Sequence, residues 1–207
     1  MSFLPAASLP ASSLNVLDMH TAGEPVRIVT GGYPVLQGAT ILDKRRDAVE
    51  NHDHLRTILM HEPRGHAGMY GVIPVQPSLA GAELAVLFCH ATGYSTMCGH
   101  ATIAIGRWAV ESGQVAHDGS TARFGLELPC GLVQVDATVE NGKVVKTAFE
   151  SVAAYIDRAN LSVPVPELGK IHCDVVFGGA FYAILPASRL NVSFEGGLTQ
   201  LTEAAAK

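Results

Sequence analysis

The chain has 207 residues, of which 48% are hydrophobic and 16% are charged, and its formal net charge is −5. This apolar content excludes a disordered chain and is enough for one large domain or two small ones. An acidic balance without a cluster of Lys and Arg gives no basis for expecting nucleic acid or an anionic membrane surface as a partner. No apolar run approaches the length of a membrane span.

The cysteines and the first residues indicate a cellular compartment. Cys89, Cys98, Cys130 and Cys173 stand far apart, with no CxxC pair and no spacing typical of a zinc site, so no metal site is predicted. Residues 1–13 are rich in Pro, Ala and Ser and lack the basic start of a secretion signal. We therefore expect a flexible leader over 1–13, reduced cysteines and a soluble cytoplasmic protein.

The fold begins with short strands and then a helical stretch. Residues 14–19 and 26–30 predict two strands, separated by a turn that Gly23 and Pro25 punctuate. Residues 40–60 have helical periodicity and end before Pro63. The apolar face expected for that helix consists of four residues: Leu42, Val49, Leu55 and Leu59.

An irregular, charged connection follows the helical stretch. We expect Glu62, Arg64 and His66 to hold this connection in place through ion pairs, and residues 69–75 predict another strand. Residues 83–90 form a continuous apolar run that ends in a histidine, which is typical of a fully buried strand. Such a strand would deliver His90 to the site and turn Cys89 to the opposite face, into the core.

Residues 93–113 are the stretch around which the chain is organised. A turn from Gly93 to Thr96 precedes a helix that is apolar on nearly every side and ends at Ser-Gly. A helix apolar all round is buried, and Cys98 stands at its N-terminal end. The unpaired amides of a helix start favour an ionised thiol, and the amides of Gly99 and His100 are suited to a carboxylate. The alternative is that Cys98 is a small buried hydrophobe.

The second half is rich in strands. Residues 123–128, 132–139 and 143–149 predict three strands, of which the last two are joined by Asn141-Gly142, a strong hairpin signal. Two more strands, 171–177 and 181–185, flank a Gly-Gly pair, and residues 198–207 turn helical. The expected fold class is therefore α+β, with antiparallel strands wrapped around one buried central helix and no clear linker before residue 188.

Five blocks of sequence carry a family resemblance. They occur in one order along the chain: Asp18–Val29, Glu62–His66 with Met69–Gly71, Gly93–His100, Pro129–Gly131 and Gly178–Tyr182. These blocks resemble the proline racemase superfamily, which includes hydroxyproline 2-epimerases and trans-3-hydroxy-L-proline dehydratases. The resemblance implies the two-lobed fold of diaminopimelate epimerase, with residues 14–190 as the N-terminal catalytic lobe and residues 191–207 as the start of the crossover to a second lobe.

The resemblance also implies a function. Cys98 would be the base that removes the α-proton of proline or hydroxyproline, Gly99, His100 and His90 would bind the substrate, and no cofactor would be needed. The continuation Ala101-Thr102-Ile103 is more similar to the dehydratases than to the racemases. A proline racemase or 4-hydroxyproline 2-epimerase, and a non-catalytic single-lobe binding protein, are the alternatives. Without its second lobe the chain is expected to be weakly active or inactive, and its uncovered apolar surface would invite homodimerisation.

Overall fold

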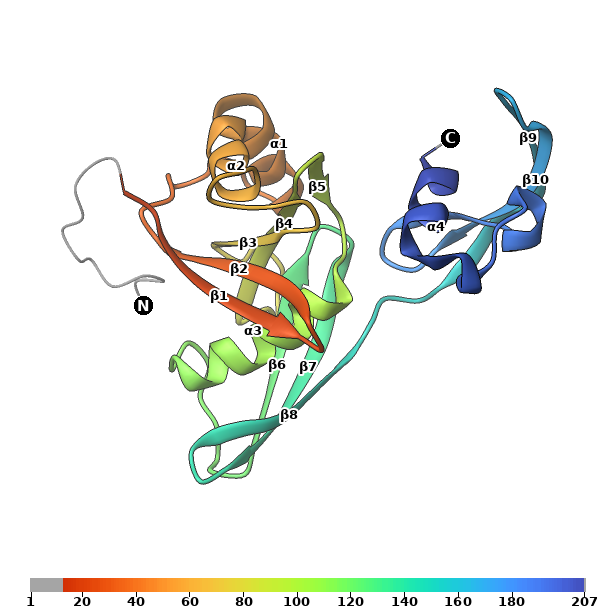
Figure 1. Ribbon diagram of the computed structural model, residues 1–207. Coiled ribbons are helices and arrows are strands. Elements are labelled where there is room, and N and C mark those ends of the chain that lie inside the picture. Colours follow the sequence, from red (N-terminus) through yellow and green to blue (C-terminus); the bar gives the residue numbers. More distant parts are fainter. Residues whose placement is uncertain (1–12, 207) are drawn as a thin grey trace. The chain divides into compact units, whose positions relative to one another are not determined.

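The computed structural model describes residues 13–206, so nearly all of the expected leader, residues 1–13, lies outside the described residues. The chain divides into two compact units between Val152 and Ala153 (Figure 1). The division falls within the range 14–190, which the sequence suggested as one lobe.

The first unit contains a mixed, eight-stranded sheet. Its order is β1-β2-β3-β4-β6-β7-β8, and β5 pairs with β4. The strands are β1 (Asn15–Thr21), β2 (Glu24–Gly31), β3 (Tyr70–Val75), β4 (Leu84–His90), β5 (Gly93–Ser95), β6 (Thr121–Leu128), β7 (Gly131–Glu140) and β8 (Lys143–Glu150).

Two of the strand pairs are parallel, namely β2 with β3 and β4 with β6, and the expectation of purely antiparallel strands is wrong for these pairs. Both connections contain helices, and such long crossovers return the chain in its original direction. The hairpin between β7 and β8 is confirmed, because Asn141 and Gly142 both have positive φ, 51° and 75°.

The helical stretch is two helices, α1 (Ile41–Asn51) and α2 (Asp53–Met60). His52 lies between them with φ −131° and ψ 11° and interrupts the helix. The expected apolar face is therefore wrong in its first half: Leu42 and Val49 are 51% and 44% exposed, whereas Ile41 is buried. A single periodicity across residues 40–60 could not hold, because each helix turns its own face to the sheet.

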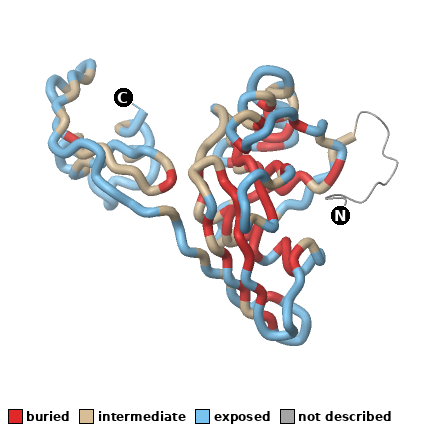
Figure 2. Tube along the Cα trace, turned by 180° about the vertical axis from the view of Figure 1, so that it is seen from behind, coloured by how far each residue is buried: buried red, intermediate tan, exposed pale blue. Residues whose placement is uncertain are grey.

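The central strands are covered on both faces. In β4, Leu84, Val86 and Phe88 belong to the core around the third helix, and the alternating Ala85, Leu87 and Cys89 belong to the core beneath α1 and α2. Figure 2 shows these buried residues gathered in the strands and helices of the first unit. The predictions of a fully buried strand and of a core position for Cys89 are confirmed.

The third helix, α3 (Gly99–Glu111), contacts β1 and β2 as well as β7 and β8. Most of its residues are buried, as an all-round apolar helix requires. It ends where the sequence predicted: the amide of Ser112 bonds to the carbonyl of Trp108, and Gly113 follows with φ 72°. Gly106 lies so close to β8 that a Cβ at this position would overlap the methyl group of Thr147.

The second unit is a three-stranded antiparallel sheet followed by short helices. The sheet has the order β11-β10-β9 and is formed by β9 (Tyr155–Val165), β10 (Gly169–Phe177) and β11 (Phe181–Ile184). The helices are η1 (Ala187–Leu190), η2 (Phe194–Gly196) and α4 (Gly197–Ala205). The sequence pattern did not predict β9: its first six residues are exposed, and only Leu161, Val163 and Val165 alternate as partly buried apolar positions.

Across residues 13–206, the helices are all too short or too polar to span a membrane.

Candidate active site

Cys98 is the N-cap of α3 and is only 6% exposed. Its carbonyl accepts two hydrogen bonds from Thr102, one from the amide at 3.0 Å and one from the hydroxyl at 2.8 Å. The hydroxyl of Thr21, at the end of β1, donates to the carbonyl of His100 at 2.8 Å. The first turn of α3 is therefore held from inside the helix and from the neighbouring strand.

The imidazole of His100 lies beside the thiol. Its Nδ1 is 3.3 Å from Cys98 Sγ, and its Nε2 is 3.4 Å from the carbonyl oxygen of Pro25. A carbonyl oxygen can only accept a hydrogen bond, so in a neutral ring Nε2 carries the proton and the lone pair of Nδ1 faces the thiol. The geometry thus provides an acceptor for the Cys98 proton.

The thiol itself is not easily ionised in this environment. Burial raises the pKa of Cys98 to about 12, although the backbone amides of Ala101 and His100 lower it, and the charge of Glu24 raises it further. The sequence-based expectation of a readily ionised thiol is therefore wrong. The helix-start amides act as expected, but loss of hydration outweighs them. A thiolate here requires transfer of the proton to a partner such as His100.

A cavity of about 430 Å³ adjoins this pair. Its lining residues come from β2, β3, β4 and α3 and the loops beside them: Glu24, Gly68, Met69, Tyr70, His90, Ala91 and His100. The ring of Tyr70 lies edge-on to His100 with 5.1 Å between centroids, and 5.5 Å from the ring of His90. Both histidines thus meet one tyrosine at the cavity. Cys98 does not line the cavity but contacts His100, which does.

His90 ends β4 and is partly buried. Its Nδ1 accepts a hydrogen bond from the amide of Thr92 at 3.3 Å, with the Thr92 hydroxyl 3.0 Å away. Because an amide nitrogen can only donate, the proton of a neutral His90 ring is on Nε2. Burial lowers the pKa of His90, and the positive charge of Arg56 lowers it further. The ring is therefore held as a neutral hydrogen-bond donor.

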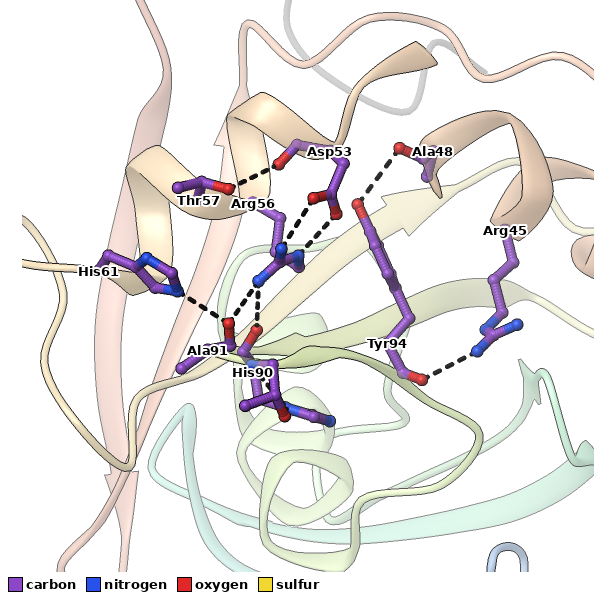
Figure 3. A network of polar contacts seen from close by, with 10 residues as sticks. Arg45, Ala48, Asp53, Arg56, Thr57, His61, His90, Ala91 and Tyr94 are labelled. Atoms are coloured by element: carbon purple, nitrogen blue, oxygen red, sulfur yellow. Dashed lines mark hydrogen bonds and ion pairs between the residues drawn. The ribbon is translucent and has the colours of Figure 1, made fainter. Parts of the chain in front are cut away.

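Arg56 of α2 holds the backbone at this end of β4 (Figure 3). Its guanidinium forms a two-point ion pair with Asp53, at 2.7 and 2.8 Å. It also donates to the carbonyls of His90 at 3.0 Å and Ala91 at 2.7 Å. The ring of His61 approaches the same Ala91 carbonyl at 2.8 Å. Two side chains of one helix region thus fix the position of His90.

Arg27 of β2 holds the backbone of the loop before β3 in the same way. It pairs with both carboxylate oxygens of Asp18 at 2.7 Å and donates to the carbonyls of Leu59 and Arg64. The expected ion pairs of this loop are not found: among residues 13–206, no salt bridge involves the exposed side chains of Glu62, Arg64 or His66. The loop is held through its backbone instead.

The structure thus brings together the four residues that the sequence suggested for the site: Cys98, Gly99 and His100 at the start of α3, and His90 at the end of β4. A Cβ at Gly99 would lie 3.6 Å from Phe149, an ordinary contact, so the fold does not require glycine there for space. Sequence reasoning gave no role to Glu24 or Tyr70, although both stand inside the blocks that carried the resemblance. Across the described range 13–206, no three His, Cys, Asp or Glu side chains are grouped to hold a metal ion.

A family model described as "Proline racemase" matches residues 16–207 of the chain. A trans-L-3-hydroxyproline dehydratase of Saccoglossus kowalevskii is 44% identical over 188 residues, which are 90% of this chain and 58% of that protein. A proline racemase of Clostridioides difficile is 38% identical over 193 residues, 91% of this chain and 58% of that protein. The chain thus spans little more than half the length of these relatives.

The solved structures show the same fold. A hydroxyproline epimerase from Agrobacterium vitis, crystallised with bound trans-4-hydroxy-L-proline, superposes with a TM-score of 0.84 at 24% identity. The superposition covers 92% of this chain and 57% of that one.

Proposed function

Since the chain belongs to the proline racemase family, we propose that it supplies the Cys98 half of a site that removes the α-proton of a cyclic imino acid. The proposed reaction is the dehydration of trans-3-hydroxy-L-proline to Δ1-pyrroline-2-carboxylate. The observation that carries the proposal is the contact of Cys98 Sγ with His100 Nδ1, 3.3 Å, at the start of a buried helix beside a cavity.

In the first step the thiol passes its proton to His100, and the resulting thiolate removes the α-proton of the substrate. The Nδ1 lone pair is directed at the thiol by the Pro25 carbonyl, which binds the opposite ring nitrogen. The amides of His100 and Ala101 stabilise the thiolate as it forms. A thiol that burial keeps neutral is in this way ionised only where a base lies in contact with it.

Removal of the α-proton sends negative charge into the substrate carboxylate, so stabilising that carboxylate is the main electrostatic task. The amide of Gly99, the first residue of α3, is the proposed donor to that carboxylate, beside the His100 amide that stabilises the thiolate. Glu24 lines the cavity and offers a carboxylate to the positively charged ring nitrogen. Pairing with that nitrogen would also neutralise the charge by which Glu24 raises the pKa of Cys98.

The dehydratase reading is supported by the names and identities of relatives such as the Saccoglossus protein, at 44%. The racemase or 4-hydroxyproline epimerase reading remains the alternative, because the Clostridioides protein is 38% identical. A dehydratase needs one base only, since the 3-hydroxyl leaves after the proton is lost. A racemase needs a second acid on the opposite face of the ring.

We also propose that the first unit is the core of an epimerase-like catalytic lobe, assigned by sequence to 14–190, with α3 at its centre. The contacts of α3 with β1 and β2, near one end of the sheet, and with β7 and β8 at the other, support this. The relatives are almost twice as long, and a site shared between two lobes loses most of its rate when half is missing. We therefore expect slow turnover from the 207-residue chain alone.

The test measures two products from the purified chain in D2O: deuterium at the α-carbon of L-proline or trans-3-hydroxy-L-proline, and Δ1-pyrroline-2-carboxylate. Cys98→Ser is the blank, and Cys130→Ser is the matched control, because Cys130 is a free cysteine outside the site. We expect elimination from the hydroxylated substrate that Cys98→Ser abolishes and Cys130→Ser retains. Inversion of L-proline would establish the racemase instead. Equal rates in chain and blank would leave a non-catalytic binding lobe.

A further inference from the structure

We propose that His90 binds the departing 3-hydroxyl of the substrate, donating a hydrogen bond from Nε2–H while remaining neutral, and that Arg56 and Thr92 position it for this task. This inference rests on the proposed dehydration. It assigns His90 to the hydroxyl and not to the ring nitrogen, and it adds two positioning residues on elements outside α3.

The ring atom of His90 that is left for a ligand is a hydrogen-bond donor. Thr92 occupies Nδ1 through its amide and hydroxyl, so the neutral ring offers only its Nε2–H, a donor, to a ligand. A positively charged ring nitrogen of the substrate is also a donor, and two donors do not bind each other. A hydroxyl oxygen accepts. The ligand atom that fits Nε2–H is therefore an oxygen.

The charged groups around His90 favour its neutral ring. The guanidinium of Arg56 donates a hydrogen bond to the His90 carbonyl. Its positive charge would repel a protonated His90 ring. His61 approaches the neighbouring Ala91 carbonyl, Tyr70 lies against the ring itself, and Glu24 and His100 line the same cavity. Of these groups only the Glu24 carboxylate favours a protonated His90. The carboxylate of Asp53 is ion-paired with Arg56.

The stereochemistry of the substrate places the departing hydroxyl on the same side as the base. In trans-3-hydroxy-L-proline the hydroxyl is trans to the carboxylate, so it lies on the same ring face as the α-hydrogen. The base and the group that receives the hydroxyl must therefore approach from one side. His90 and His100 both contact Tyr70 at one cavity, and His100 contacts Cys98. One unit of the fold thus carries both groups that a same-face elimination needs.

The Cys98 thiolate takes the α-proton, the electron pair of that C–H bond becomes the Cα=Cβ bond of the enamine, and the Cβ–O bond breaks with its electrons on oxygen. His90 stabilises the charge on that oxygen without losing its own proton. The oxygen takes the proton that Cys98 received, leaves as water, and the thiolate is restored.

The first experiment determines the tautomer of His90 in the chain by NMR of ¹⁵N-labelled histidine, with His90→Gln to assign the signal. We expect a neutral ring protonated on Nε2 at neutral pH, which trans-3-hydroxy-L-proline shifts and L-proline does not. His117 is the internal control, because its Nδ1 also accepts from an amide, that of Gly119 at 3.1 Å, but far along the chain from the site. A ring protonated on Nδ1, a charged ring, or equal shifts from both imino acids would overturn the proposal.

The second experiment compares elimination from trans-3-hydroxy-L-proline with α-deuteration of L-proline. For His90→Gln we expect the elimination to fall about 100-fold, the usual effect of removing one donor from a developing oxyanion, and to fall at least tenfold more than the deuteration. Equal losses would assign His90 to the ring nitrogen or to the fold and overturn the inference. If the unmodified chain acts on neither substrate, the slow turnover expected of this chain alone is refuted, and the tautomer measurement still decides the state of His90.

Positioning by Arg56 is tested with Arg56→Lys, which keeps the charge but has only three donors for the four hydrogen bonds that Arg56 makes. The matched control is Arg46→Lys, on an exposed arginine of α1 that pairs with Asp43. We expect Arg56→Lys, and not Arg46→Lys, to shift the His90 ring signals and to lower the ratio of elimination to deuteration. An unchanged ratio with unchanged ring signals would remove Arg56 from the proposal.

Discussion

Replacement of Arg56 by methionine tests how much the guanidinium contributes to the fold of the first unit. The Arg56 side chain is 10% exposed and makes four hydrogen bonds, two with Asp53 and one each with the carbonyls of His90 and Ala91. Methionine fills a similar volume, so the loss is mainly electrostatic. Breaking a buried pair costs about 3–5 kcal/mol, and we expect the lower end, about 3 kcal/mol, because water can reach Asp53.

The assay is urea unfolding followed by the fluorescence of Trp108, the single tryptophan, which is buried in α3. Arg46→Met is the control and should leave the midpoint almost unchanged, because its arginine is 64% exposed. Asp53→Asn in the same background should reduce the cost of Arg56→Met, since part of the partner's charge is already gone. If Arg56→Met and Arg46→Met unfold at the same urea concentration, the guanidinium does not stabilise this unit.

Three further outcomes follow from burial and packing. Burial raises the pKa of Cys89 to about 12. The free energy of unfolding should therefore fall by about 1.4 kcal/mol per pH unit as pH rises above the unfolded thiol pKa of about 8.5. Urea titrations should show a weaker dependence of that free energy on pH for Cys89→Ala. Iodoacetamide should label the half-buried Cys130 before Cys98, and mass spectrometry that finds Cys98 modified first would contradict the burial argument. Gly106→Ala should destabilise the first unit although alanine favours helix, because the new methyl overlaps Thr147; addition of Thr147→Ala should restore most of the loss in thermal melts, and failure to do so would place the strain elsewhere.

The sequence by itself determined the elements whose cause is local. The all-round apolar pattern before Ser112-Gly113 defined α3 as a buried helix, Asn141-Gly142 defined a hairpin, and the run ending at His90 defined a buried strand. It also placed Cys98 at a helix start, because the unpaired amides of a first turn follow from chain geometry alone. These features follow from the local sequence and do not depend on residues elsewhere in the fold.

Only the tertiary structure decided those features of the site residues that depend on partners distant in sequence. The Pro25 carbonyl, from β2, fixes the tautomer of His100, and Arg56, from α2, holds His90. The pKa of Cys98 rises because the fold removes water from the thiol, an effect that outweighs the amides visible in the sequence. Desolvation depends on everything packed around an atom, so it cannot be predicted from a local pattern of residues.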